Sequence, residues 1–203
     1  MKSITFRSVL GTTAALVALL WGTAATAQAP LSLGSARITI AGTSNVHDYT
    51  ATTATARVTR VELGDVTPGA TFWDDVQKST GLKAFDITIP AETLKSGKDG
   101  LDKNMYKALK TKEHADITFR LTKLEGAAGA LKATGILKIA GVEREVVLPL
   151  KTTKKGTQLA VTGELAVLMT DYGIQPPKAM MGMVKADPKV TVTFDVVLAI
   201  ATT

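Results

Sequence analysis

Cysteine is absent from the 203 residues of this chain, and aromatic residues are scarce. Without cysteine the chain forms no disulfides, and a lipid-anchored lipoprotein is excluded. Five Phe, three Tyr and two Trp are too few for the two aromatic girdles of a membrane-spanning barrel. The net charge is +6, but the lysines are scattered and do not alternate with stacking aromatics, so nucleic acid is not an expected partner. An anionic membrane surface or a phosphate-bearing ligand remains compatible with this mild excess of positive charge.

Residues that could catalyse a reaction or bind a metal are also few. The only histidines are His47 and His114, whereas a catalytic zinc site usually has three protein ligands and a structural site has four. Ser44 precedes His47 by three residues, but no Gly-x-Ser-x-Gly turn marks a nucleophile, and the dispersed glycines form no phosphate loop. We therefore expect no catalytic residue, no metal and no cofactor. His114 is interpreted as a solvated residue between a helix and a strand.

The first 27 residues have the pattern of a secretory signal peptide. Two basic residues precede an apolar run over residues 9–21, and the small residues Ala25 and Ala27 stand at the expected cleavage positions. The run is shorter than the ~20 residues of a membrane-spanning helix, which disfavours a retained anchor. We expect residues 1–27 to be removed and residues 28–203 to form one domain, in the periplasm or outside the cell.

Along the rest of the chain the dominant signal is the alternation of apolar and polar residues, which is typical of half-buried strands. Eight such segments are predicted, at residues 36–40, 48–63, 85–89, 117–121, 131–140, 142–151, 158–169 and 190–200. An open sheet of this size leaves unpaired edges, which closure removes. The predicted fold class is therefore all-β, an eight-stranded antiparallel barrel whose interior has room for side chains or one slim ligand. A sandwich of two sheets is the alternative.

One short helix is predicted between the third and fourth strands. Leu101, Met105, Ala108 and Leu109 recur at helical spacing and form one apolar stripe. A helix of about three turns is not stable alone in water, so this stripe must rest on an apolar surface. The mouth of a barrel offers such a surface, and we expect the helix to close one end as a lid. The alternative is a helix packed on the outer wall.

Three stretches resemble the YceI-like family of secreted, lipocalin-like barrels that bind polyisoprenoids and related lipids. Residues 101–119 are similar to the family's helix and the strand after it, GILKIAGVEREVVLPL at 135–150 is similar to its hairpin, and DYGI at 171–174 is similar to its D-F-G-I turn. The resemblance implies an eight-stranded, lipocalin-like barrel with an elongated apolar interior and a helix near one end. The sequence departs from the family where the opening region has a single histidine, His47, and where Ala115 replaces the usual proline.

The predicted function is that of a non-enzymatic protein that holds a long apolar ligand, a polyisoprenoid or similar lipid, in a tunnel. The residues expected to line the tunnel are Phe85, Ile87, Met105, Leu109, Phe119, Met169, Met181 and Phe194. The residues expected at the rim, beside a polar headgroup, are His47, Tyr49 and Tyr172.

Two other features leave alternatives open. The methionines within residues 175–189 suit an adaptable apolar site, and a Cu(I) site is the less favoured interpretation. Phe72 and Trp73 are interpreted as covering the rim or packing in the core. The alternative function is a periplasmic stress or interaction scaffold that acts through its outer surface, and the oligomeric state, monomer or homodimer, is left open.

Overall fold

The computed structural model describes residues 30–201, so the predicted signal peptide lies outside the described residues. The strands are β1 (Leu31–Ser44), β2 (Tyr49–Thr53), β3 (Arg57–Leu63), β4 (Leu82–Pro90), β5 (Asp116–Ala127), β6 (Ala130–Ile139), β7 (Val142–Lys155), β8 (Gln158–Leu168), β9 (Lys178–Ala179) and β10 (Val184–Ile200). The helices are α1 (Phe72–Val76) and α2 (Asp99–Leu109), with short 3-10 turns η1 (Ala91–Thr93), η2 (Met169–Tyr172) and η3 (Met180–Gly182).

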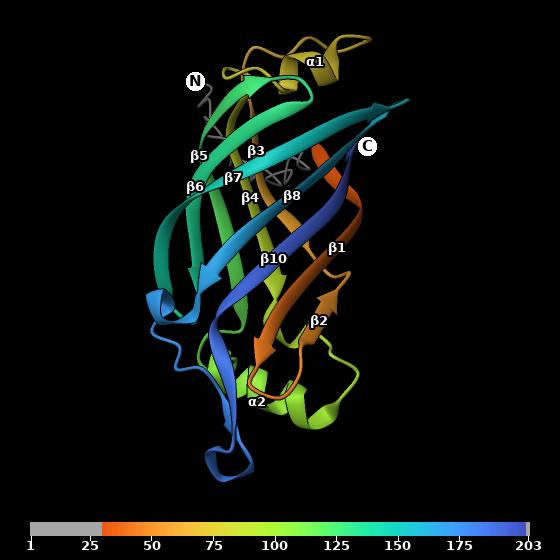
Figure 1. Ribbon diagram of the computed structural model, residues 1–203. Coiled ribbons are helices and arrows are strands. Elements are labelled where there is room, and N and C mark those ends of the chain that lie inside the picture. The colour runs from red at the N-terminus through yellow and green to blue at the C-terminus, as the bar shows by residue number, and fades with distance from the viewer. Residues whose placement is uncertain (1–29, 202–203) are drawn as a thin grey trace, which may run out of the picture.

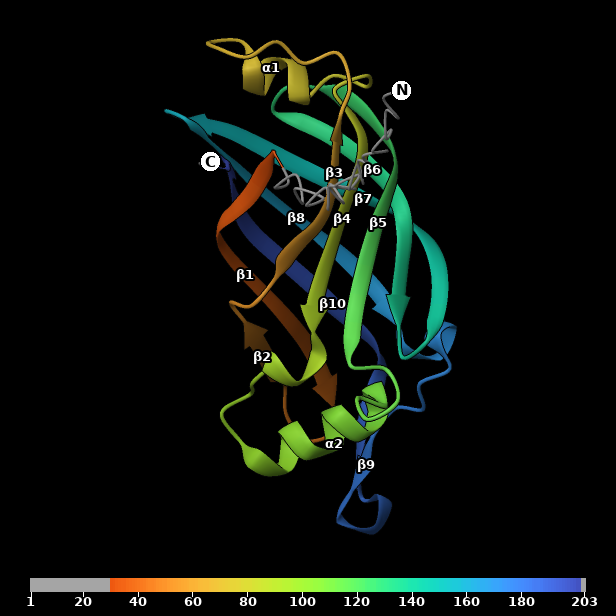
Figure 2. The ribbon, with the colours of Figure 1, turned by 180° about the vertical axis from the view of Figure 1, so that it is seen from behind.

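The strands form one antiparallel sheet whose two ends are joined by the chain itself. Their order is β2-β1-β10-β8-β7-β6-β5-β4-β3, and β9 pairs with β10. β2 and β3 stand at opposite ends of this order, yet only residues 54–56 separate them in the sequence. The sheet therefore curls round into a barrel (Figure 1, Figure 2), which confirms the predicted all-β, lipocalin-like fold.

The strand count differs from the prediction because one predicted strand changes partner. The segment 48–63 is divided into β2, which pairs with β1, and β3, which pairs with β4. At the division the backbone N–H of Thr55 donates to the side-chain oxygen of Thr53 at 2.9 Å, so a side chain replaces a bond of the strand ladder. This division and the two-residue β9 turn the eight predicted strands into ten within residues 30–201.

Alternation places the apolar face of each strand inside the barrel. In β4, Phe85 and Ile87 face the interior, and Asp86 between them lies on the other face, opposite Arg120 of β5. The buried side chains gather in three clusters, one towards each end of the barrel and one around Leu121 and Leu131. The core thus follows the barrel axis and leaves space between its layers.

α2 lies across one end of the barrel, as the apolar stripe predicted (Figure 1). Its N-terminal turn is held by Asp102, which accepts a hydrogen bond from the Ser96 backbone N–H at 2.8 Å. Tyr106 fixes the helix to the η1 segment, because its hydroxyl donates to the backbone carbonyls of Glu92 and Leu94 at 2.9 and 2.7 Å. The lid is therefore anchored by hydrogen bonds to the segment between β4 and α2, while its stripe faces the barrel.

α1 lies at the opposite end and was not predicted as a helix (Figure 2). Its five residues are too few to give a periodic signal. Phe72 and Trp73 are buried there, with their rings 5.1 Å apart in an edge-to-face arrangement. The indole N–H of Trp73 donates to the carbonyl of Thr157 at 3.0 Å, which ties α1 to the β7–β8 turn. Core packing, one of the two interpretations for these rings, is what the structure shows.

Among residues 30–201, no helix has the length and apolar character required to cross a membrane.

Candidate functional site

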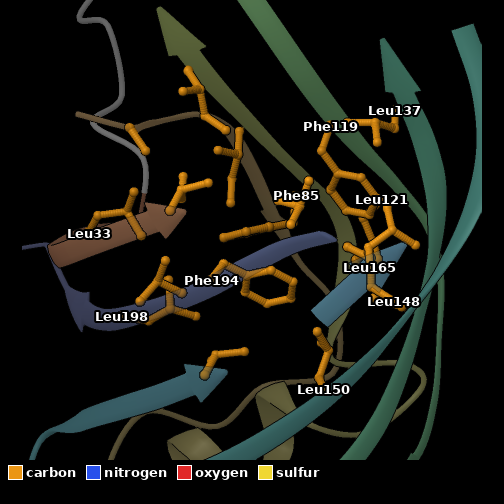
Figure 3. Close-up of a pocket in the computed structure, with 18 of the residues that line it drawn as sticks. Leu33, Phe85, Phe119, Leu121, Leu137, Leu148, Leu150, Leu165, Phe194 and Leu198 are labelled. Atoms are coloured by element: carbon orange, nitrogen blue, oxygen red, sulfur yellow. The ribbon is translucent and has the colours of Figure 1, made fainter. Parts of the chain in front are cut away.

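An apolar cavity of about 210 Å³ occupies the middle of the barrel. Its walls come from the inward faces of β1, β4–β8 and β10. Ala56 before β3, Val76 at the end of α1, Gln77 after it and Leu94 after η1 complete the lining. Figure 3 shows aromatic and leucine side chains converging on this space, among them Phe85, Phe119, Leu121, Leu148 and Phe194. We call this space the inner cavity.

The polar side chains that line the inner cavity bond to their neighbours. The Thr152 hydroxyl donates to the Gln77 amide oxygen at 2.5 Å, and the Gln77 amide nitrogen donates to the carbonyl of Trp73 at 2.8 Å. The backbone N–H of Gly129 donates to the Thr152 hydroxyl at 2.8 Å. Because these groups are already satisfied, the inner cavity offers a ligand apolar contact alone.

Two glycines keep the inner cavity open by letting phenylalanine rings lie against the wall. Gly163 of β8 is the strand partner of Phe194, and a Cβ at this glycine would stand 2.9 Å from a ring carbon. Gly135 of β6 pairs with Leu121, and a Cβ at this glycine would stand 2.6 Å from a ring carbon of Phe119. A glycine in a strand often marks such a close approach. Each ring covers a glycine and so does not fill the lumen.

A second cavity of about 460 Å³ lies between the barrel and α2, and we call it the outer cavity. It is lined by the helix stripe, Leu101, Met105, Ala108 and Leu109, and by Met169 and Tyr172 of η2. Ile40, Ile117, Ile139 and Val192 line both cavities, which therefore adjoin. The two spaces follow one another from the middle of the barrel to the lid.

The outer cavity carries polar groups, unlike the inner one. Lys98, Asn104 and Lys178 line it and bring hydrogen-bond donors to a largely apolar wall. Burial raises the pKa of Tyr49, and the negative charge of Asp187 adds to the effect, so this phenol stays protonated at neutral pH. This end of the tunnel suits a polar headgroup that accepts hydrogen bonds.

The phenol of Tyr172 is also held protonated. Its side chain is buried under the lid, where desolvation raises its pKa, with the charge of Asp171 in the same direction and that of Arg144 opposing it. A neutral tyrosine in an apolar wall supplies a donor without placing a charge beside the ligand.

His47 stands at the exposed edge of the outer cavity in a local turn. The Ser44 hydroxyl donates to the His47 carbonyl at 2.8 Å and accepts from the His47 backbone N–H at 3.1 Å. The same hydroxyl lies 3.4 Å from Nδ1 of the imidazole. Residues 30–201 contain no group of three or more His, Asp or Glu side chains placed to hold a metal ion.

The structure brings most of the predicted site residues to the two cavities. Phe85, Ile87, Phe119 and Phe194 line the inner cavity, and Met105, Leu109, Met169, His47, Tyr49 and Tyr172 line the outer one. Their contact with a ligand stays a prediction.

Met181 is placed differently from its prediction and lines neither cavity. Its side chain is 99% exposed and stands in the turn that joins β9 to β10, beyond the end of the barrel. Composition suggested an apolar lining here, but the hairpin carries the side chain away from the tunnel into solvent.

Other lining residues were missed although their signal was visible. Leu148 and Leu150 of β7, and Leu131 and Ala133 of β6, occupy alternate positions whose period places them on the inner face. Lys178 of β9 gave no such signal, since only the return of the chain beside β10 brings it to the cavity. His114 is half-buried and packs against Gly141 in the β6–β7 turn, so it is less solvated than expected.

Solved structures share this architecture at low sequence identity. BcnA of Burkholderia cenocepacia is 15% identical, covers 82% of this chain and 96% of its own, and superposes with a TM-score of 0.64. A polyisoprenoid-binding domain of Saccharophagus degradans, implicated in plant cell wall breakdown, is 13% identical over 86% of this chain and 100% of its own, with a TM-score of 0.61. The YceI protein of Campylobacter jejuni is 18% identical over 73% and 85%, with a TM-score of 0.53.

A comparison with curated protein sequences found no match. The family model described as the YceI-like domain matches residues 34–198, which span β1 to β10 and therefore nearly the whole barrel. This chain belongs to the YceI-like family.

Proposed function

We propose that this protein is an exported, non-enzymatic lipid-binding protein that holds one long apolar chain along the axis of its barrel. The observation that carries the proposal is the pair of adjoining cavities, of about 210 and 460 Å³. The larger one alone falls in the usual range of ligand pockets, roughly 300–1,000 Å³. The apolar tail occupies the inner cavity, and the polar end lies under α2 beside Lys98, Asn104 and Lys178.

Burial of the tail supplies the affinity. Each methylene group removed from water contributes ~0.8 kcal/mol, so ten such groups contribute on the order of 8 kcal/mol before the costs of association. A polar substituent in the middle of the tail would lose its hydrogen bonds to water without gaining new ones, because Gln77 and Thr152 are already hydrogen-bonded to each other. The ligand class that fits is a hydrocarbon or isoprenoid chain with one polar end.

The relatives and the chemistry of the site support this assignment. The Saccharophagus degradans domain with the same fold is described as polyisoprenoid-binding. The contact between Ser44 and His47 belongs to a local turn, which supports a non-enzymatic role. Export rests on residues 1–27 as a signal peptide, which leaves residues 28–203 as the mature domain in the periplasm or outside the cell.

The proposal is tested by filling the inner cavity. Ala133 lines it and is 3% exposed, so Ala133→Phe places a ring in the space meant for the tail. Thr134→Phe is the matched control, because the next residue of the strand points to the opposite face. Displacement of a fluorescent long-chain probe by an isoprenoid alcohol measures the affinity of each variant.

We expect Ala133→Phe to weaken binding by tenfold or more and Thr134→Phe to leave it unchanged, with both melting temperatures recorded to show that the variants are folded. Equal binding by a folded Ala133→Phe would contradict a tunnel ligand. A stoichiometric protein partner that both variants retain, together with no binding of the probe, would favour the outer-surface scaffold instead.

A further inference from the structure

The barrel end that holds the outer cavity also carries the most exposed apolar side chains. Among the described residues, Met181, Met183 and Val46 are 99%, 67% and 66% exposed, more than any other large apolar residue. Met181 and Met183 stand at the turn of the β9–β10 hairpin, and Val46 stands in the β1–β2 loop. In both ribbon views the hairpin extends past α2, away from the barrel (Figure 1, Figure 2).

Hydrogen bonds hold these two loops together as one projection. The side-chain nitrogen of Asn45 donates to the Met183 carbonyl at 2.8 Å, and the Lys185 backbone N–H donates to the Asn45 side-chain oxygen at 2.7 Å. The backbone N–H of Asn45 donates to the Lys185 carbonyl at 3.1 Å. The loop that carries Val46 is therefore fixed to the hairpin whose turn carries Met181 and Met183, and we call these three residues the tip.

Positive charge predominates around the tip. The exposed lysines of α2 and the hairpin at this end are Lys98, Lys103, Lys107, Lys178, Lys185 and Lys189. The exposed acids on the neighbouring segments are Asp48, Glu92, Asp99, Glu113, Asp116, Asp171 and Asp187. Three more exposed lysines, Lys95, Lys110 and Lys112, flank α2, so lysines still outnumber acids. All five ion pairs found among residues 30–201 join other residues, so these lysines keep their charge available to a partner.

We propose that the tip docks this end of the barrel on an anionic lipid bilayer. Apolar side chains that enter the headgroup region, together with lysines that face lipid phosphates, are the two attractions that hold interfacial segments on membranes. A protein partner fits less well, because the core of a protein interface is depleted in lysine and this projection is narrow. Two methionines on a hairpin turn, with a valine on the loop bonded to it, suit insertion between lipids.

Docking in this orientation would bring the ligand cavity to the membrane. Pro177, Lys178, Val184 and Ala186, at the base of the hairpin, line the outer cavity. With the tip inserted, the space between hairpin and lid faces the bilayer, and an apolar chain could pass between membrane and barrel without crossing water. This inference adds a membrane contact to the proposed function and does not depend on which lipid the barrel holds.

The test measures binding of the mature chain to vesicles at about 0.15 M salt, where surface charges more than ~8 Å apart are screened. Vesicles of phosphatidylcholine with phosphatidylglycerol are compared with vesicles of phosphatidylcholine alone. Met181→Ser with Met183→Ser removes the apolar contact, and Lys178→Gln with Lys185→Gln removes two charges. Val147→Ser with Lys151→Gln is the matched control, since both residues are exposed on the barrel wall of β7.

We expect binding only to the anionic vesicles. The methionine pair should lose at least about tenfold in affinity, the lysine pair about 25-fold, from roughly fivefold per lysine, and the control pair nothing. Cosedimentation should give the same vesicle affinity for protein stripped of lipid and for protein loaded with lipid. This inference and the proposed function can therefore fail separately.

Insertion is read from a tryptophan placed at the tip. Met181→Trp should shift its emission to shorter wavelength on anionic vesicles, while Val147→Trp on the barrel wall should not. An unshifted emission, or a methionine pair that binds as well as the parent protein, would overturn insertion of the tip. Capture of a protein partner by this end, with no vesicle binding, would overturn the proposal as a whole.

Discussion

Gly163 gives the sharpest link between a single residue and the open lumen. A Cβ added there would stand 2.6 Å from the carbonyl oxygen of Pro149 and 2.9 Å from a ring carbon of Phe194. The backbone contact cannot be relieved by rotating a side chain, so Gly163→Ala must shift β7, and its second contact pushes the Phe194 ring into the inner cavity. Both responses oppose the gain of roughly 0.5–1 kcal/mol that alanine normally gives over glycine within a strand.

The expected magnitude follows from overpacking, which typically costs 1–3 kcal/mol in a well-packed core. After the alanine gain is subtracted, Gly163→Ala should lower the free energy of unfolding by about 1 kcal/mol, in a range of roughly 0–2.5 kcal/mol. It should also reduce binding of a long-chain probe, because the displaced ring occupies the space of the tail. In a Phe194→Leu background the same change should cost about 1 kcal/mol less, since one of its two collisions is gone.

Urea unfolding followed by Trp73 fluorescence measures these free energies. Trp21 lies in the predicted signal peptide, so Trp73 is the only tryptophan of residues 28–203. Gly100→Ala is the control, because a Cβ there meets nothing within 4 Å, and its expected effect is neutral or slightly stabilising. The reasoning is refuted if Gly163→Ala keeps full stability and probe binding, or if its cost is the same with and without the Phe194 ring.

Three further changes test other parts of the structure. Asp75 is held by hydrogen bonds from Lys78, Thr67 and Thr71, which lower the pKa of its carboxyl group. Asp75→Asn should therefore lower the melting temperature at neutral pH, and the difference from the parent protein should fade as the pH falls below the usual carboxyl range near 3.9. A difference that stays constant down to pH 2 would contradict this. Tyr106→Phe removes the hydroxyl that anchors the lid, so hydrogen exchange of α2 amides should quicken by about tenfold, for a loss of roughly 1–1.5 kcal/mol, while strand amides keep their protection. Met105→Ser should weaken probe binding, because Met105 lines the outer cavity, whereas Met181→Ser should not, because Met181 is exposed. Equal losses of affinity in a binding titration would argue against the placement of the lid.

The barrel could be predicted because its signals are local and periodic. Alternation in β4, β7 and β10 assigns each side chain to one face, and the stripe of α2 requires an apolar surface that only a barrel end supplies. The division of the segment 48–63 could not be predicted, because it arises when closure gives one strand two partners. α1 was missed because five residues carry no period, and tertiary contacts of Trp73 hold it in place.

The site was predictable on its inner face and less so at its open end. Alternate residues such as Phe85 and Phe119 lie where their period places them, whereas Lys178 and Met181 depend on how the β9–β10 hairpin leaves the barrel. Two residues close in sequence therefore differ in placement, because Lys178 is exposed yet lines the outer cavity, whereas Met181 lines neither cavity. Composition detected the methionines, but only the path of the chain decides which of them reach the tunnel.

The central claim is that the two adjoining cavities together hold one amphiphilic lipid. Native mass spectrometry of the mature protein, purified from its own cells without detergent, tests this most directly. The account predicts one added mass per chain, which organic extraction releases as a long-chain or isoprenoid lipid with one polar end, and which Ala133→Phe removes. A bare polypeptide mass in every preparation, with no uptake of such lipids when they are supplied, would contradict it.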